Sequence, residues 1–230
     1  MKLVLLPGMD GTGELFAPFL RVLPGEQEVV VITYPREQPT QPEQLVELIL
    51  SQLPNKPFLL LAESYSGALA YQAALRKPEH LQGVVFVATF LTCPYPLLLR
   101  GLHAIGTVVL RVSPPNFIIG LLMLGFSANS QLLALFRTSL QTVHTDVLLQ
   151  RLQHIIELQS PKSAISYPCF FLQAQHDRLV PQSSLHAFRL ISNQLRIYPV
   201  AGPHLILQAS PALCWVVIEE VIEICRRAIP

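Results

Sequence analysis

The chain has 230 residues, enough for one domain with a full hydrophobic core or for one domain that carries an inserted subdomain, and we expect one domain. Only 13% of the residues are charged and the formal net charge is +1, so a basic patch that neutralises phosphates, and with it a nucleic-acid-binding role, is disfavoured. Hydrophobic residues make up 51% of the chain and the mean hydropathy is +0.43, which raises the question of a membrane span. The longest apolar stretch, 117–126, is about half of the ~20 residues that a bilayer requires, so the sequence predicts no transmembrane segment.

Short apolar runs alternate with longer amphipathic stretches, the pattern of a parallel sheet covered by helices on both faces. The first run, 2–6, contains one charge and ends in a glycine turn, so we interpret it as a core strand rather than a signal peptide and expect a cytoplasmic protein. The other predicted strands are 29–34, 58–63, 83–90, 168–175 and 194–200, and the predicted helices between them are 15–23, 42–53, 67–76, 182–191 and 211–227.

A glycine-rich loop, Leu6-Pro7-Gly8-Met9-Asp10-Gly11-Thr12-Gly13, follows the first predicted strand. It lacks the lysine of a phosphate-binding P-loop, and its G-x-x-G-x-G order differs from the dinucleotide fingerprint. We therefore interpret it as a loop whose flexible backbone offers the Met9 N–H to an oxyanion that forms during acyl transfer.

The third predicted strand runs directly into Ala62-Glu63-Ser64-Tyr65-Ser66-Gly67, and a helix-forming stretch follows. A serine at such a strand-to-helix turn is a candidate nucleophile, because the tight turn pushes its hydroxyl clear of the sheet. The segment departs from the G-x-S-x-G pattern at Ala62 and Ser66, and a glycine comes one residue late. Taken alone, the motif is weak evidence, and an ordinary helix N-cap is the commoner explanation of such a serine.

The segment 93–160 breaks the alternation, because it shows only helical periodicity. We expect it to form a helical cap, or lid, inserted into a core made of 1–92 and 161–230. Its predicted helices are 97–112, 116–124, 130–140 and 145–158. The first two are apolar on nearly all sides, so we expect them to pack on the body of the protein or to line an apolar pocket rather than to face solvent. Candidate pocket residues are Phe117, Leu121 and Leu124, although plain packing is the commoner role for such residues.

Acyl transfer by a serine needs a base that activates it and an acid that orients the base. Of the three aspartates, Asp10 lies in the first turn, and Asp146 opens a predicted helix, where the helix dipole explains it. Asp177 follows the fifth predicted strand at its carboxyl end, where open α/β sheets bind ligands; a helix-capping aspartate is the alternative. His204 lies in the loop after the last predicted strand, and the other six histidines fall on helices, at helix ends or beside another candidate. The chain order is thus nucleophile, acid, histidine.

The chain resembles the α/β-hydrolase-fold esterases over its whole length. The resemblance is carried by the first loop, 6–13, by the elbow Glu63-Ser64-Tyr65-Ser66-Gly67, by Asp177-Arg178-Leu179-Val180-Pro181 and by Gly202-Pro203-His204. The order nucleophile, acid, histidine is also that of this fold. Within the superfamily the chain is similar to small bacterial-type hydrolases with a four-helix cap, such as the pimeloyl-carrier-protein methyl ester esterases, and its first loop is similar to that of the plant plastid phytyl ester synthases.

The resemblance implies that Ser64 is the nucleophile, His204 the base and Asp177 the orienting acid, and that the Met9 and Tyr65 N–H groups bind the oxyanion. The expected reaction is ester hydrolysis through an acyl-enzyme, without an organic cofactor. No metal is expected, since the four cysteines lack the spacing of a zinc site. The apolar cap favours a small-molecule ester with an alkyl or acyl chain, because each buried CH₂ contributes about 0.8 kcal/mol.

The sequence leaves partners and rival functions open. Arg100, Arg111 and Arg137 could receive an acidic acyl carrier protein or a carboxylate, although solvated helix faces are the commoner explanation. An acyltransferase would use the same residues with an alcohol in place of water, and the sequence does not distinguish the two acceptors. A non-catalytic ligand-binding protein with this fold ranks last, because we would expect it to lack a member of the triad.

Overall fold

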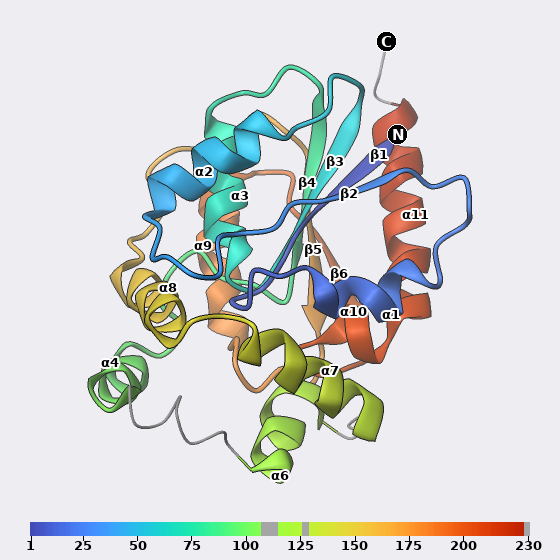
Figure 1. The fold of residues 1–230 in the computed structure, drawn as a ribbon. Helices are drawn as coiled ribbons and strands as arrows, with labels where there is room; N and C mark the ends of the chain where they lie inside the picture. The colour runs from blue at the N-terminus through green and yellow to red at the C-terminus, as the bar shows by residue number, and fades with distance from the viewer. Residues whose placement is uncertain (107–114, 126–128, 228–230) are drawn as a thin grey trace.

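The structure is a computed structural model that describes residues 1–106, 115–125 and 129–227. Within these residues, six parallel strands form one sheet in the order β2-β1-β3-β4-β5-β6 (Figure 1). The strands are β1 (Lys2–Leu6), β2 (Val29–Val31), β3 (Phe58–Glu63), β4 (Leu81–Val87), β5 (Cys169–Ala174) and β6 (Arg196–Val200). All six predicted strands are confirmed, with ends that move by a few residues.

Helices cover both faces of the sheet, as the near-continuous apolar strands require (Figure 1). On one face, buried residues of the strands pack with α2 (Pro42–Ser51), α3 (Ser66–Leu75) and α9 (Leu185–Ile191). On the other face they pack with α1 (Ala17–Leu20) and α11 (Pro211–Arg227). The predicted three-layer α/β architecture is therefore confirmed.

The connections of the sheet create one crevice at its carboxyl edge. The chain passes from β1 to β2 on one side and then returns to place β3 on the other side of β1. The loops that leave β1 and β3 therefore diverge at a topological switch point, where parallel sheets bind ligands. These two loops are the glycine-rich loop and the turn that carries Ser64.

The described residues between β4 and β5 that adopt regular structure are helical and lie beyond the carboxyl ends of the strands (Figure 1). They form α4 (Pro96–Ala104), α6 (Asn116–Ile119), which continues into the π-helical turn η2 (Gly120–Leu124), α7 (Ser130–Gln141) and α8 (Thr145–Glu157). The helical character of this segment matches the prediction, and the end of the predicted helix 97–112 lies outside the described residues. Its status as a separate cap stays a prediction.

Four short or irregular elements complete the fold of the described residues. They are the 3₁₀ turns η1 (Glu14–Phe16) and η4 (Gln182–Ser184), the helix α10 (Ile206–Ala209), which was not predicted, and η2. No helix in the described ranges is both long and apolar enough to cross a bilayer.

The prediction that the first two helices of this segment avoid solvent is wrong for several residues. Leu97 is 85% exposed, Leu98 67% and Phe117 72%. For Leu97 and Leu98 the reason is that α4 has its main contact, among the described elements, with α8, and none of the residues Pro96–Ala104 is buried. A helix that is supported along one side leaves its other sides in water, whatever their composition.

Candidate active site

The structure brings together the three residues that the chain order singled out. Ser64 Oγ lies 2.9 Å from His204 Nε2, and His204 Nδ1 lies 2.9 Å from Asp177 Oδ2. Because the carboxylate can only accept, Nδ1 carries the imidazole proton and Nε2 is left to accept the Ser64 hydroxyl proton. The second carboxylate oxygen, Asp177 Oδ1, accepts from the Leu179 and Val180 N–H groups at 2.8 and 2.9 Å, which fixes the carboxylate plane.

Ser64 occupies the strained turn that its position between β3 and α3 predicts. Its φ angle is 50°, in the left-handed region that non-glycine residues rarely adopt. The Ser64 N–H donates to the Val87 carbonyl at 3.0 Å, and Thr89 Oγ1 donates to the Ser64 carbonyl. A Cβ at Gly67 would overlap Thr89 Oγ1 and lie 2.8 Å from Thr89 Cγ2. The late glycine of the motif is therefore required by the approach of α3 to Thr89.

Ser66, which replaces the second glycine of the G-x-S-x-G pattern, links the turn to the first loop. Its side chain is buried, donates to the Pro7 carbonyl and shares a hydrogen bond of 2.6 Å with the Tyr34 hydroxyl. In the same loop, a Cβ added at Gly8 would lie 3.8 Å from Ser64 Cβ. The first loop and the nucleophile turn are therefore in direct contact.

One of the two predicted oxyanion donors, Met9, lies in the first loop, and the other, Tyr65, directly follows Ser64 in its turn. In the part of the chain that the structure describes, neither the Met9 nor the Tyr65 backbone N–H donates a hydrogen bond. Tyr65 immediately precedes α3, and no side chain caps the N-terminus of that helix. Neither N–H group is engaged by another described residue, and their role as oxyanion donors stays a prediction.

Asp10 has a structural role that sequence reasoning did not find. Its buried carboxylate accepts hydrogen bonds from the Thr12 N–H and from the Thr12 and Ser139 hydroxyls. Ser139 lies on α7, so the first loop is tied to the helical segment between β4 and β5.

The environment of His204 sets its basicity. Burial of the imidazole opposes protonation, but the charge and hydrogen bond of Asp177, with a contribution from Glu63, raise the pKa of His204 above its ordinary value. A base with a raised pKa takes up the serine proton more readily once its neutral form is populated.

Glu63 is a second buried carboxyl beside the nucleophile, which sequence reasoning treated only as part of the motif. Burial raises the pKa of Glu63 to about 7, although a hydrogen bond from Gln208 and the charge of His204 oppose this. Gln208 Nε2 donates to Glu63 Oε2 at 3.2 Å. Glu63 therefore gains or loses its proton near neutral pH.

The candidate pocket residues lie in different surroundings. Phe117 is largely exposed and Leu121 is half exposed, whereas Leu124 is buried in a cluster that includes Leu205, the neighbour of His204. The Leu205 N–H donates to the Met123 carbonyl, which brings η2 against the His204 loop. Participation of these residues in substrate binding stays a prediction.

Of the candidate carrier-protein contacts, Arg100 is exposed on α4, Arg137 is half-buried on α7, and Arg111 lies outside the described residues. Among the side chains that the structure describes, no group of three or more histidine, cysteine, aspartate or glutamate residues is arranged to hold a metal ion.

A family model described as serine aminopeptidase, S33, matches residues 42–207. The chain belongs to this family. The matched span contains Ser64, Asp177 and His204, while the first loop lies before it. The predicted membership of the α/β-hydrolases is thereby confirmed.

A curated relative, the biotin biosynthesis bifunctional protein BioHC of Cellvibrio japonicus, is 28% identical over an aligned length of 212 residues, and the alignment covers 85% of this chain and 40% of that protein. The chain thus spans less than half the length of this relative. An esterase from Thermogutta terrifontis superimposes with a TM-score of 0.78 at 17% identity, covering 98% of this chain and 90% of that one. A hydrolase from Oleispira antarctica superimposes with a TM-score of 0.76 at 16% identity, covering 97% of this chain and 91% of that one. At this low sequence identity, the structural similarity shows that the chain has the α/β-hydrolase fold.

Proposed function

We propose that the protein is a serine hydrolase that cleaves carboxylic esters. The proposal is carried by the continuous hydrogen bonding from Ser64 Oγ through His204 to Asp177, at 2.9 Å for each contact. A hydroxyl beside a neutral imidazole, whose other nitrogen is held by a carboxylate, is the arrangement that activates serine for acyl transfer.

In the proposed reaction, Ser64 Oγ attacks the ester carbonyl carbon while His204 Nε2 takes the hydroxyl proton. The oxyanion accepts hydrogen bonds from the Met9 and Tyr65 N–H groups, each typically worth about 3 kcal/mol of barrier. The imidazolium, stabilised by Asp177, gives its proton to the departing alcohol oxygen and leaves an acyl-enzyme. Water then attacks the acyl carbon as His204 takes its proton, and the Ser64–acyl bond breaks as that proton returns to Oγ and the acid departs.

We further propose that residues 93–160 form a cap over this site and that the substrate carries an apolar chain. Support comes from the position of these helices beyond the carboxyl ends of the strands and from the contact of η2 with the His204 loop (Figure 1). A narrower form of the proposal is that an acidic carrier protein delivers the acyl chain. It is supported by the exposed Arg100 and by a relative named for biotin biosynthesis. A cytoplasmic location stays a prediction from the sequence.

The test is hydrolysis of p-nitrophenyl esters from acetate to palmitate by the wild type, Ser64→Ala and the control Ser51→Ala, an exposed serine on α2. We expect Ser64→Ala to lose roughly a thousandfold or more in rate, Ser51→Ala to match the wild type, and one chain length to be preferred. Inactivity at every length would contradict ester hydrolysis, and activity retained by Ser64→Ala would contradict the assignment of the nucleophile. Adding a primary alcohol distinguishes the acyltransferase, which would form a new ester instead of the acid.

A further inference from the structure

One helix, α8, contacts both residues whose N–H groups are proposed to bind the oxyanion. Arg151 and His154 lie one turn apart on α8, so their side chains leave the same face of the helix. Both are buried, although an arginine on an amphipathic helix usually faces water.

Arg151 holds the first loop at the proposed oxyanion donor. The residue is only 2% exposed, and Nη1 donates to the Met9 and Asp10 carbonyls at 2.8 and 2.7 Å. Nη2 donates to the Pro35 carbonyl at 2.7 Å. The first loop makes room for the guanidinium because Gly11 has no side chain, and a Cβ there would lie 2.6 Å from Arg151 Nη1. A planar guanidinium that binds consecutive carbonyls fixes the orientation of the peptide planes that follow Met9.

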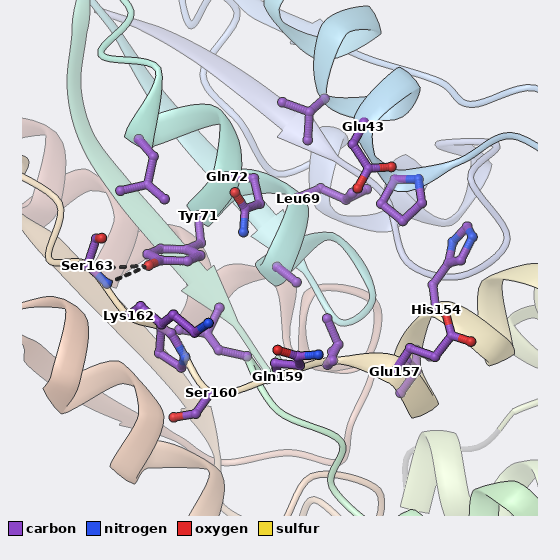
Figure 2. Close-up of a pocket in the computed structure, with 18 of the residues that line it drawn as sticks. Glu43, Leu69, Tyr71, Gln72, His154, Glu157, Gln159, Ser160, Lys162 and Ser163 are labelled. Carbon is purple, nitrogen blue, oxygen red and sulfur yellow. Dashed lines mark hydrogen bonds between the residues drawn. The ribbon is translucent and has the colours of Figure 1, made fainter.

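His154 holds the second donor residue through its side chain. The Tyr65 hydroxyl and His154 Nδ1 form a hydrogen bond of 2.9 Å, and the two rings are stacked with their centroids 6.4 Å apart. Burial lowers the pKa of His154, although Glu157 and Glu43 oppose this. Figure 2 shows His154 beside Glu43 at one end of a cavity of about 530 Å³, which Tyr65 also lines.

We propose that Arg151 and His154 are positioning residues for the oxyanion hole: Arg151 orients the backbone at Met9, and His154 orients Tyr65. Glycine-rich backbone is flexible, and an oxyanion hole stabilises the transition state only when its donors are held in place beforehand. The two contacts supply that restraint from one helix. The inference rests on the proposed function, since the two N–H groups have this role only if Ser64 is the nucleophile.

The experiment compares Arg151→Met, Arg151→Lys and Tyr65→Phe with the wild type, with Tyr71→Phe as the matched control. Tyr71 lies on α3, and its hydroxyl donates to the Ser163 carbonyl at 2.8 Å on another wall of the cavity (Figure 2). The readouts are kcat and KM for the preferred p-nitrophenyl ester and the inhibition constant of a trifluoromethyl ketone with the same chain, which forms a tetrahedral adduct with the nucleophilic serine.

We expect Arg151→Met and Tyr65→Phe to lower kcat by about tenfold or more, with KM changed less than about twofold, and to weaken the ketone in proportion to kcat/KM. Arg151→Lys should recover part of the loss, because it keeps a donor but not the planar fork. Tyr71→Phe should keep all three constants within about twofold, although it loses both hydrogen bonds between its hydroxyl and the Ser163 backbone.

The proposal is overturned if Arg151→Met and Tyr65→Phe change only the unfolding temperature, as Tyr71→Phe would, and leave kcat and the inhibition constant at wild-type values. If Arg151→Met fails to fold, Arg151→Lys tests the contact with the first loop and Tyr65→Phe tests the contact with His154. Ser64→Ala, measured alongside, distinguishes a failure of the proposed function from a failure of this inference. Activity retained by Ser64→Ala refutes the proposed function, whereas its loss together with unaffected positioning variants refutes only this inference.

Discussion

Replacing Glu63 by glutamine should stabilise the protein at alkaline pH and change its stability little at acid pH. Glu63 is 1% exposed. Within the described residues, Glu63 Oε1 and Gln208 Oε1 are buried without a hydrogen-bond partner. A protonated Glu63 carries a donor that the carboxylate lacks, and a glutamine at this position carries an N–H of similar placement at every pH. The substitution therefore mimics the neutral acid.

The magnitude follows from the pKa of Glu63, which burial raises from 4.5 to about 7. Between these two values the folded protein binds one proton more than the unfolded chain, so the free energy of unfolding falls by about 1.4 kcal/mol per pH unit. The loss begins above pH 4.5 and is complete above pH 7, where it amounts to about 3 kcal/mol. Glutamine does not ionise, and the variant should lack this loss.

The assay is urea unfolding of the wild type and Glu63→Gln at about pH 5 and pH 8, with Glu219→Gln, an exposed position on α11, as control. The variant should match the wild type within about 1 kcal/mol at the lower pH and exceed it by about 3 kcal/mol at the higher pH. The control should show no such difference. A Glu63→Gln protein that is less stable than the wild type at pH 8, or equally shifted at both pH values, would refute the reasoning.

Gly67→Ala should lower the free energy of unfolding by about 1–3 kcal/mol, because its Cβ would overlap the Thr89 hydroxyl. Gly101→Ala, on α4 with open space around the added Cβ, should be neutral or stabilising in the same urea unfolding experiment, and equal effects of the two substitutions would contradict this account. The pH profile of kcat/KM should have its acid limb above pH 6.5, because burial of His204 is outweighed by the acids that raise its pKa and only the neutral imidazole accepts a proton. A limb below pH 6.5 would be evidence against this environment.

The candidate site could be found from the sequence because its residues follow strands. Ser64, Asp177 and His204 each come shortly after an apolar run, and parallel strands bring such loops to one edge of the sheet. The number of residues that separate these three was therefore uninformative, whereas their order along the chain indicated the site. The first loop was placed correctly for the same reason, since it leaves β1 beside β3.

Contacts between distant segments could not be predicted. Arg151 lies on an amphipathic helix, where an arginine normally indicates a solvent-exposed face, and its burial depends on carbonyls more than a hundred residues away. The need for glycine at position 67 depends on Thr89, in a loop after the next strand. The exposure of Leu97 and Leu98 is the converse case: their composition indicates burial, but the packing of α4 against α8 leaves them in solvent.

The most direct test of the central claim is inactivation by a p-nitrophenyl alkylphosphonate, followed by peptide mapping with mass spectrometry. The account predicts that one phosphonyl group adds per chain, that it is found on Ser64, and that ester hydrolysis stops in proportion to the fraction modified. Modification of a different residue, or hydrolysis that continues when Ser64 is fully modified, would contradict the assignment of Ser64 as the nucleophile.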